Sequence, residues 1–340
     1  MRNRIYYPYV KGQATFVLTP TGNGSGVSTL RMTASENTTL TIVGDGANFY
    51  TNSGGTEGQS KTWTITSGAL RTIYLKCTSE AKLVIPEQRL ITQWGSSSSD
   101  GWVSSTNAAT ISSAGFPLRN ITTVRVAGNN TVSGDLADAP ANLAYLYVLG
   151  SNTISGSIAN APADLTTLYL LGSNTVSGDI ADAPADLATL VITGSNTVTG
   201  DIANIPANLT TLYITGSNTI NDYTKGKSFA NNFNYLRTIG NQGLSQSKLI
   251  DLIVDISAAT WGGGSRTFNM GSPNASMADT TQGGIWGDFS GTPAPSTLAT
   301  AYKTLIKTKT VTVTLNGITV PGGSGDGTGF PSGFGDWYRS

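Results

Sequence analysis

The sequence contains no histidine, one cysteine and few charged residues. Its 340 residues include 20 basic and 20 acidic side chains, so the formal charge is zero and only 12% of the chain is charged. Without histidine, a Ser-His-Asp triad, a histidine general base and a histidine metal ligand are all excluded. A neutral chain also lacks the basic footprint typical of nucleic-acid-binding proteins, so we expect no nucleic-acid partner.

The cysteine count and the hydrophobic pattern exclude further classes of protein. Cys77 is alone, which rules out an internal disulfide and a multi-cysteine zinc site, and we interpret it as a small buried apolar residue. No run of 18 apolar residues is present, so the sequence predicts no membrane insertion. Residues 1–8 carry two positive charges without a following apolar segment, and we therefore expect no secretory signal.

A tandem repeat dominates the middle of the chain. Its period is 22 residues, as the equally spaced prolines Pro140, Pro162, Pro184 and Pro206 show. Leucines and asparagines recur at the same spacing, and five units are visible between Pro117 and Ile220. A fixed period of this length predicts stacked structural units that share one core.

The repeat resembles the leucine-rich repeats of the short bacterial type. One unit has Pro162, Leu165, Leu168 and Leu170, followed by Asn174, Val176, Gly178 and Ile180. The resemblance implies a parallel strand per unit, with these leucines, Val176 and Ile180 pointing inward and the asparagine bonded to backbone groups of neighbouring units. In the family, two residues separate the last strand leucine from the asparagine. In this chain three residues separate Leu170 from Asn174, which predicts a bulge at the strand end. The Ala-Pro segments favour an extended return path without a helix.

The two ends of the repeat region have different patterns, as expected of caps on a solenoid. Residues 1–100 contain short alternating runs, such as 14–18, 28–33 and 38–43, that predict a small antiparallel β domain. Residues 231–320 predict helix-then-strand units that resemble larger leucine-rich repeats, with helices after Ser245 and over 296–307, strands at 266–270 and 311–315, and a hairpin at Asn316-Gly317. The expected fold class is thus mainly β, with a solenoid at 101–230 between these caps.

Residues 321–340 form a tail in which glycines alternate with aromatic residues. Its aromatic side chains are Phe330, Phe334, Trp337 and Tyr338. Four aromatic side chains are costly to leave in water, which favours a segment that docks on a partner or on this chain over a disordered tail. Gly325-Asp326-Gly327 is too poor in oxygen ligands to form a calcium site.

The outward-facing positions of the repeat strands form the first candidate binding surface. The middle position of successive strands reads Arg125, Tyr147, Tyr169, Val191 and Tyr213, and Tyr145 flanks Tyr147. Alternation places these residues on the face opposite the leucines, which is the concave face of a leucine-rich-repeat solenoid. A stripe of Tyr and Thr suits contact with a protein or a glycan. The alternative is a cross-strand ladder that only stabilises the sheet.

The acidic positions Asp135, Asp179 and Asp201 recur with the repeat, and Ser157 interrupts them. Two close carboxylates are able to share a proton or act on a glycosidic bond. Repetition of the position favours a structural turn residue instead. We therefore expect no catalytic residue, no metal, no cofactor and no enzymatic activity.

The overall composition gives a second resemblance. Low charge, no histidine, abundant small polar residues and the Gly/aromatic tail look like virion proteins of tailed bacteriophages. This resemblance implies a fibre or tail-associated protein, assembled in the bacterial cytoplasm, that binds a host-surface protein or glycan or another virion protein. Zero net charge permits self-association. The alternatives are a secreted or surface-bound bacterial adhesin or effector and a purely architectural spacer.

Overall fold

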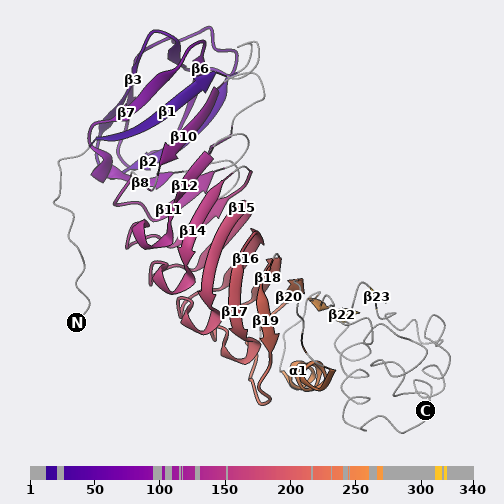
Figure 1. Ribbon diagram of the computed structural model, residues 1–340. Helices are drawn as coiled ribbons and strands as arrows, with labels where there is room; N and C mark the ends of the chain where they lie inside the picture. Colours follow the sequence, from indigo (N-terminus) through magenta and orange to yellow (C-terminus); the bar gives the residue numbers. More distant parts are fainter. Residues whose placement is uncertain are drawn as a thin grey trace. The chain divides into compact units, whose positions relative to one another are not determined.

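The computed structural model describes most of the chain up to Ala259 and shorter segments beyond it (Figure 1). The described residues are 13–20, 27–94, 102–103, 109–114, 116, 118–126, 131–150, 152–215, 217–230, 232–239, 244, 246–259, 266–270, 311–315 and 318–319. The predicted helix at 296–307 and the aromatic tail lie outside them, as does Ser245.

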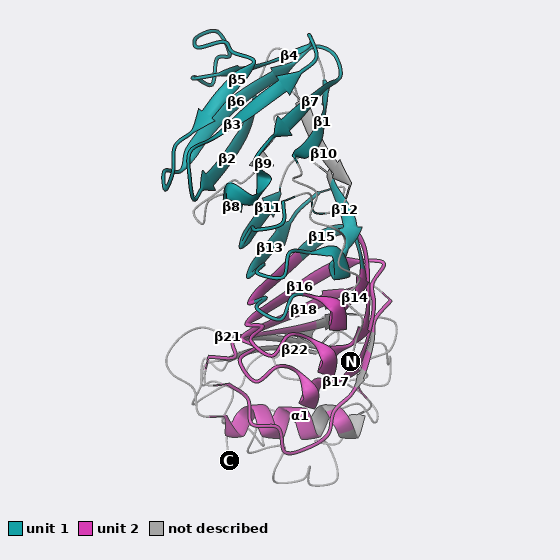
Figure 2. Ribbon diagram, turned by 90° about the vertical axis from the view of Figure 1, so that its left-hand side faces the viewer, with its two compact units in different colours: residues 1–155, 162–165, 170–173 teal, residues 156–161, 166–169, 174–340 magenta. Residues whose placement is uncertain are grey.

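The described part of the chain is mainly β, with parallel and antiparallel strands and one α-helix. It divides into two compact units, coloured separately in Figure 2. Unit 1 comprises residues 1–155, 162–165 and 170–173, and unit 2 comprises residues 156–161, 166–169 and 174–340. The mainly β fold class and the parallel strands predicted from the sequence are confirmed.

Unit 1 contains two sheets, each beginning with antiparallel strands and continuing with parallel ones. Sheet 1A has the order β5–β3–β7–β1–β10–β12–β14, and sheet 1B has the order β4–β6–β2–β8–β11–β13, with β9 also paired to β2. Sheet 1A is formed by β1 (Ala14–Pro20), β3 (Thr38–Val43), β5 (Thr62–Ile65), β7 (Ala81–Ile85), β10 (Ala109–Ala114), β12 (Thr131–Asp135) and β14 (Thr153–Ser157). Sheet 1B is formed by β2 (Ser28–Ala34), β4 (Ala47–Tyr50), β6 (Arg71–Cys77), β8 (Ile91–Trp94), β9 (Trp102–Val103), β11 (Thr123–Val126) and β13 (Tyr145–Val148).

Unit 2 also contains two sheets, and both are parallel except for a terminal hairpin. Sheet 2A consists of the end of β15 (Thr167–Asp179), β17 (Thr197–Asp201) and β19 (Thr219–Asp222). Sheet 2B consists of β16 (Thr189–Gly194), β18 (Thr211–Thr215), β20 (Tyr235–Ile239), β21 (Arg266–Met270), β22 (Val311–Leu315) and β23 (Ile318–Thr319). The strands β21 and β22, the hairpin partner β23 and helix α1 (Gln246–Ala258) match the sequence-based expectations.

The sequence repeat appears directly in the strand register. Thr189 of β16 pairs with Thr211 of β18, its equivalent one repeat later, and Thr123 of β11 pairs with Tyr145 of β13 in the same way. In the unit from Pro162, the side chains predicted to point inward (Leu165, Leu168, Leu170, Val176 and Ile180) are all fully buried. Burial of one side-chain face on each strand fixes the register, because a slip by one residue would expose the whole apolar set.

Each of the first four repeats returns through a single 3₁₀ turn, which differs from the extended path that we predicted. These turns are η2 (Leu136–Asp138), η3 (Ile158–Asn160), η4 (Ile180–Asp182) and η5 (Ile202–Asn204). In η4, the carboxylate of Asp179 accepts a hydrogen bond from the Ala181 amide at 2.8 Å, and the Ala183 amide donates to Ile180 at 3.2 Å. The turn needs only three residues and one side-chain cap. It therefore fits before the Ala-Pro segment, where we expected no room for a helix.

The regularly spaced asparagines of the repeat have the predicted structural role. The side-chain oxygen of Asn196 accepts a hydrogen bond from the Val176 amide at 2.9 Å, and that of Asn218 accepts one from Val198 at 2.8 Å. Asn152 bonds to Val132 at 2.7 Å in the same way within unit 1. Each asparagine thus supplies a partner for a buried backbone amide in the preceding repeat.

Glycine fills the extra position before the asparagine. Gly172 has a φ of +135°, and a Cβ atom there would collide with the carbonyl oxygen of Gly150 one repeat earlier. The added residue of this repeat is therefore a site of close backbone approach that only glycine permits.

We predict that Asn196→Ala lowers the free energy of unfolding by about 1–3 kcal/mol, because the buried Val176 amide loses its partner. Urea denaturation measures this loss. Asn142→Ala is the control, because Asn142 is exposed and its amide lies 3.5 Å from Asn120. The control should change the free energy of unfolding by less than about 0.5 kcal/mol. Equal effects of the two substitutions would contradict the structural role of the repeat asparagine.

Candidate binding surface

An arginine and two tyrosines form a cluster on the outward face of sheet 1B. Arg125 of β11 pairs in register with Tyr147 of β13, and its guanidinium carbon lies 4.1 Å from the centre of the Tyr147 ring. The Tyr145 ring stacks beside Tyr147 with centroids 6.2 Å apart and an angle of 12° between the planes. These three side chains are half-buried, whereas the alternating Leu146 and Val148 are fully buried. We call this group the unit 1 cluster.

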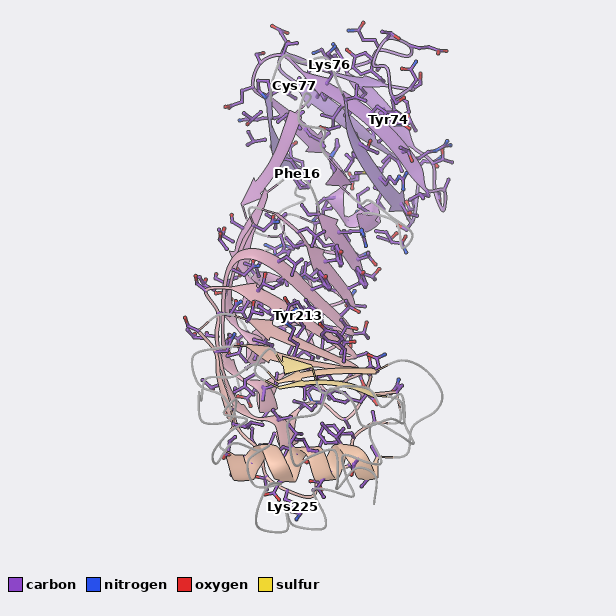
Figure 3. The ribbon with its side chains drawn as sticks, turned by 90° about the vertical axis from the view of Figure 1, so that its right-hand side faces the viewer. Phe16, Tyr74, Lys76, Cys77, Tyr213 and Lys225 are labelled. Atoms are coloured by element: carbon purple, nitrogen blue, oxygen red, sulfur yellow. The ribbon has the colours of Figure 1, made fainter. Side chains whose placement is uncertain are left out.

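Unit 2 has a cluster of the same composition on sheet 2B. Tyr213 of β18 pairs in register with Arg237 of β20, whose guanidinium carbon lies 4.8 Å from the Tyr213 ring centre. Tyr235 meets Tyr213 edge to face, with centroids 6.1 Å apart and an angle of 67°. We call Tyr213, Tyr235 and Arg237 the unit 2 cluster; Figure 3 labels Tyr213 within it. In the unit 1 cluster the arginine lies on the earlier strand, β11, whereas in the unit 2 cluster it lies on the later strand, β20.

The sequence reasoning missed Tyr235 and Arg237. Carried on from Tyr213, the period of the repeat leads to Tyr235, whereas the residue that pairs with Tyr213 is Arg237, so β20 falls out of period. A local signal in the sequence points to these two residues. Tyr235, Leu236 and Arg237 repeat the alternation of Tyr213 and its neighbours, with Leu236 fully buried between two half-buried side chains.

The remaining predicted surface residues have different placements. Tyr169 is half-buried on β15, between the fully buried Leu168 and Leu170. Val191 occupies the same register position as Tyr213 but is only 3% exposed, so it presents little surface. Phe330, Phe334, Trp337 and Tyr338 lie outside the described residues.

The two types of sheet carry opposite charges, although the whole chain is neutral. The described strands of sheets 1B and 2B contain no Asp or Glu. Their basic residues are Arg31, Arg71, Lys76, Arg125, Arg237 and Arg266. The strands of sheets 1A and 2A contain one basic residue, Lys82, and the acidic residues Asp135, Asp179, Asp201 and Asp222. Four of the six, Arg31, Lys76, Arg125 and Arg237, alternate with buried residues and so lie on the faces that hold the Arg-Tyr clusters.

The arginines of both clusters have polar groups that remain uncommitted within the described part of the chain. The Nε atoms of Arg125 and Arg237 are buried and have no hydrogen-bond partner there. The described ion pairs involve other basic residues, namely Arg89, Lys225 and Lys248. A guanidinium that packs its flat face on a tyrosine ring still has its in-plane N–H groups available to a ligand.

The recurring acids serve as caps of the 3₁₀ turns. Asp135, Asp179 and Asp201 each accept a hydrogen bond from the backbone amide two residues later, at 2.7 to 2.8 Å, and the hydroxyl of Ser157 does so at 3.3 Å. Asp201 also bonds to the amide and hydroxyl of Thr224 at 3.1 and 2.6 Å. This capping role explains why the position recurs in each repeat and why Ser157 occupies it in one of them.

A polar cluster in unit 2 joins α1 to the segment after β19, and it was not expected from the sequence. The fully buried Tyr223 donates a hydrogen bond from its hydroxyl to Asp255 at 2.6 Å, and the Gly226 amide donates to the same carboxylate oxygen. Burial and this bond to Asp255 raise the pKa of Tyr223 above its ordinary value, so the hydroxyl stays protonated. The contacts fix α1 in place.

The other ionisable groups give no sign of a metal or redox site in the described segments. Cys77 is fully buried, as predicted, and burial raises the pKa of its thiol above the ordinary value. The segments contain no group of three or more Cys, Asp or Glu residues arranged to hold a metal ion. They also contain no helix long and apolar enough to cross a membrane.

Comparisons of the chain with protein-family models, with curated proteins and with solved structures gave no match. The residues of the clusters and the charges around them therefore carry the functional argument.

We predict that Asp179→Ala lowers the free energy of unfolding by about 0.5–2 kcal/mol because the η4 turn loses its cap. Asp179→Asn should be nearly neutral, since asparagine also caps such turns. Asp182→Ala, an exposed acid in the same turn, is the control and should change the value by less than about 0.5 kcal/mol. Chemical denaturation compares the three. An unchanged free energy of unfolding in Asp179→Ala would contradict the capping role.

Proposed function

We propose that this chain is a non-enzymatic recognition protein that binds its partner through the outward faces of sheets 1B and 2B. The observation that carries the proposal is the presence of the same Arg-Tyr-Tyr group in both units. Tyrosine and arginine are the residues most enriched at binding hot spots, because they combine a large flat surface with directed hydrogen bonds. A half-buried tyrosine held by its neighbours also loses little conformational entropy on binding.

The scaffold that we propose is a leucine-rich-repeat solenoid with a cap at each end. The parallel pairing of equivalent residues in successive repeats, the buried leucines and the asparagine bonds to the preceding repeat support it. The antiparallel strands of unit 1 would form the N-terminal cap, since sheets 1A and 1B both run on into parallel strands. Helix α1 with β20 to β22 would form the C-terminal cap.

The narrower proposal is a fibre or tail-associated protein of a phage particle. The low charge, the absence of histidine and the Gly/aromatic tail support this setting. The partner would then be a protein or glycan of the host surface or a neighbouring virion protein. A particle component would be assembled in the bacterial cytoplasm.

An architectural spacer is the second candidate, and one observation favours it. The contacts of Arg125 with Tyr147 and of Tyr213 with Arg237 each join adjacent strands. Cross-strand pairs of this kind stabilise a sheet even when they bind nothing.

We predict that Tyr147, Tyr169 and Tyr213 changed together to Ala abolish binding to host cells while the fold survives. A pull-down with whole bacterial cells of several strains measures binding, and circular dichroism checks the fold. Val43, Trp63 and Leu70 changed together to Ala serve as the control, because this variant removes apolar side chains away from the clusters, two of them largely exposed.

The spacer predicts a different outcome. If the chain is a spacer, the variant with all three tyrosines changed would bind host cells as the parent does and would fail in particle assembly. Strain-selective binding that survives the loss of all three tyrosines would overturn the proposed recognition surface.

A further inference from the structure

We propose that the Arg-Tyr clusters bind an acidic polysaccharide, with the carboxylate of a sugar received by the arginine and the sugar rings packed on the tyrosines. This inference rests on the proposed recognition function and assigns the chemical class of its ligand. Three features carry it: the absence of acids on these strands, the uncommitted arginine donors and the mixture of tyrosine with threonine around them.

The charge distribution selects an anionic ligand. The outward positions of the described strands in sheets 1B and 2B carry four basic residues, and these strands contain no acidic residue, although the full chain has 20 of each. The acids of the neighbouring sheets are held at turns, where Asp135, Asp179 and Asp201 bond to backbone amides. No carboxylate of the strands in sheets 1B and 2B therefore competes with an incoming anion for the arginines. Attraction between a basic face and an acidic partner gives specificity as well as faster association.

The arginine geometry selects a carboxylate. Arg125 lies over the Tyr147 ring and Arg237 lies over the Tyr213 ring, so a guanidinium face is occupied in each cluster while its edge is not. The buried Nε atoms lack partners among the described residues. Because these Nε atoms are buried, a carboxylate would approach the outer end of the guanidinium and accept two parallel N–H bonds from its two Nη groups, and the tyrosine ring would hold the guanidinium in the orientation that this requires.

The rest of the face selects a polysaccharide over a nucleic acid. Threonines flank the clusters, because Thr123 pairs with Tyr145 and Thr211 pairs with Tyr235. Hydroxyl groups beside flat aromatic rings match sugars, which have an apolar ring face and a rim of hydroxyls. Each cluster holds one arginine, whereas a strand of phosphates needs a dense basic groove and gives a strongly basic protein.

The test compares the full chain with a variant carrying Arg125→Gln and Arg237→Gln. The probes are polygalacturonate, alginate and hyaluronate, and the matched neutral probe is fully methyl-esterified polygalacturonate. We expect binding to at least one acidic polymer, measured by isothermal titration calorimetry, and at least about tenfold weaker binding to the methyl ester where polygalacturonate is the polymer bound. The double Gln variant should lose at least about tenfold in affinity, and Arg125→Lys with Arg237→Lys should lose less.

A charge-matched control separates the clusters from general electrostatics. Arg89→Gln with Lys225→Gln also removes one positive charge from each unit, and both side chains are more than half exposed in surface ion pairs. This variant should bind as the parent does. An equal loss in the control and in the cluster variant would overturn the assignment.

The remaining outcomes distinguish failure of this inference from failure of the proposed function. Equal affinity for polygalacturonate and its methyl ester, or no binding to any of the three acidic polymers, would show that the clusters do not recognise a carboxylate. Tighter, arginine-dependent binding of single-stranded DNA would reassign the face to phosphate polymers. Cell binding that needs the tyrosines but not the arginines would retain the recognition surface and reject an anionic ligand, whereas cell binding that needs neither would reject the surface itself.

Discussion

One hydrogen bond per repeat sets the geometry on which the other features depend. The side chain of a buried asparagine enters the preceding repeat and accepts a bond from its backbone, as Asn196 does from the Val176 amide at 2.9 Å. A buried amide without a partner is costly, so this bond holds successive repeats in one register. Constant register then places every leucine inward and every middle strand position outward. A surface of regularly spaced side chains follows from it.

The division of charge follows from the same geometry. Turn positions need short polar side chains as caps, and aspartate satisfies this need in three of the four repeat turns. Outward strand positions need residues that suit a half-buried pleated surface, which tyrosine and threonine do. The acids thus gather at turns, and the outward faces of sheets 1B and 2B carry arginines while their described strands contain no carboxylate. Such a face is able to recognise an anionic partner without a high net charge.

The sequence predicted the repeated part of the structure better than the rest. The period identified the inward leucines, the role of the asparagine and the outward positions of Tyr147 and Tyr213. The 3₁₀ turns were missed because the Ala-Pro segments were expected to be extended, and a capped turn of three residues fits before them. Tyr235 and Arg237 were missed because the longer spacing to β20 breaks the period. The contacts of Arg125 and Arg237 with tyrosine rings depend on strand pairing, which no single repeat encodes.

Deletion of one whole repeat shows whether the repeat sets the register of the protein. Removal of residues 185–206 joins Pro184 to Ala207, so that the chain continues in the same register with one repeat fewer. We expect a folded protein with the β circular dichroism of the parent, whereas removal of residues 185–195, half a repeat, should abolish cooperative unfolding in urea. If both deletions fold equally well, or if neither folds, the register set by the repeat is not the unit from which this protein and its proposed binding surface are built.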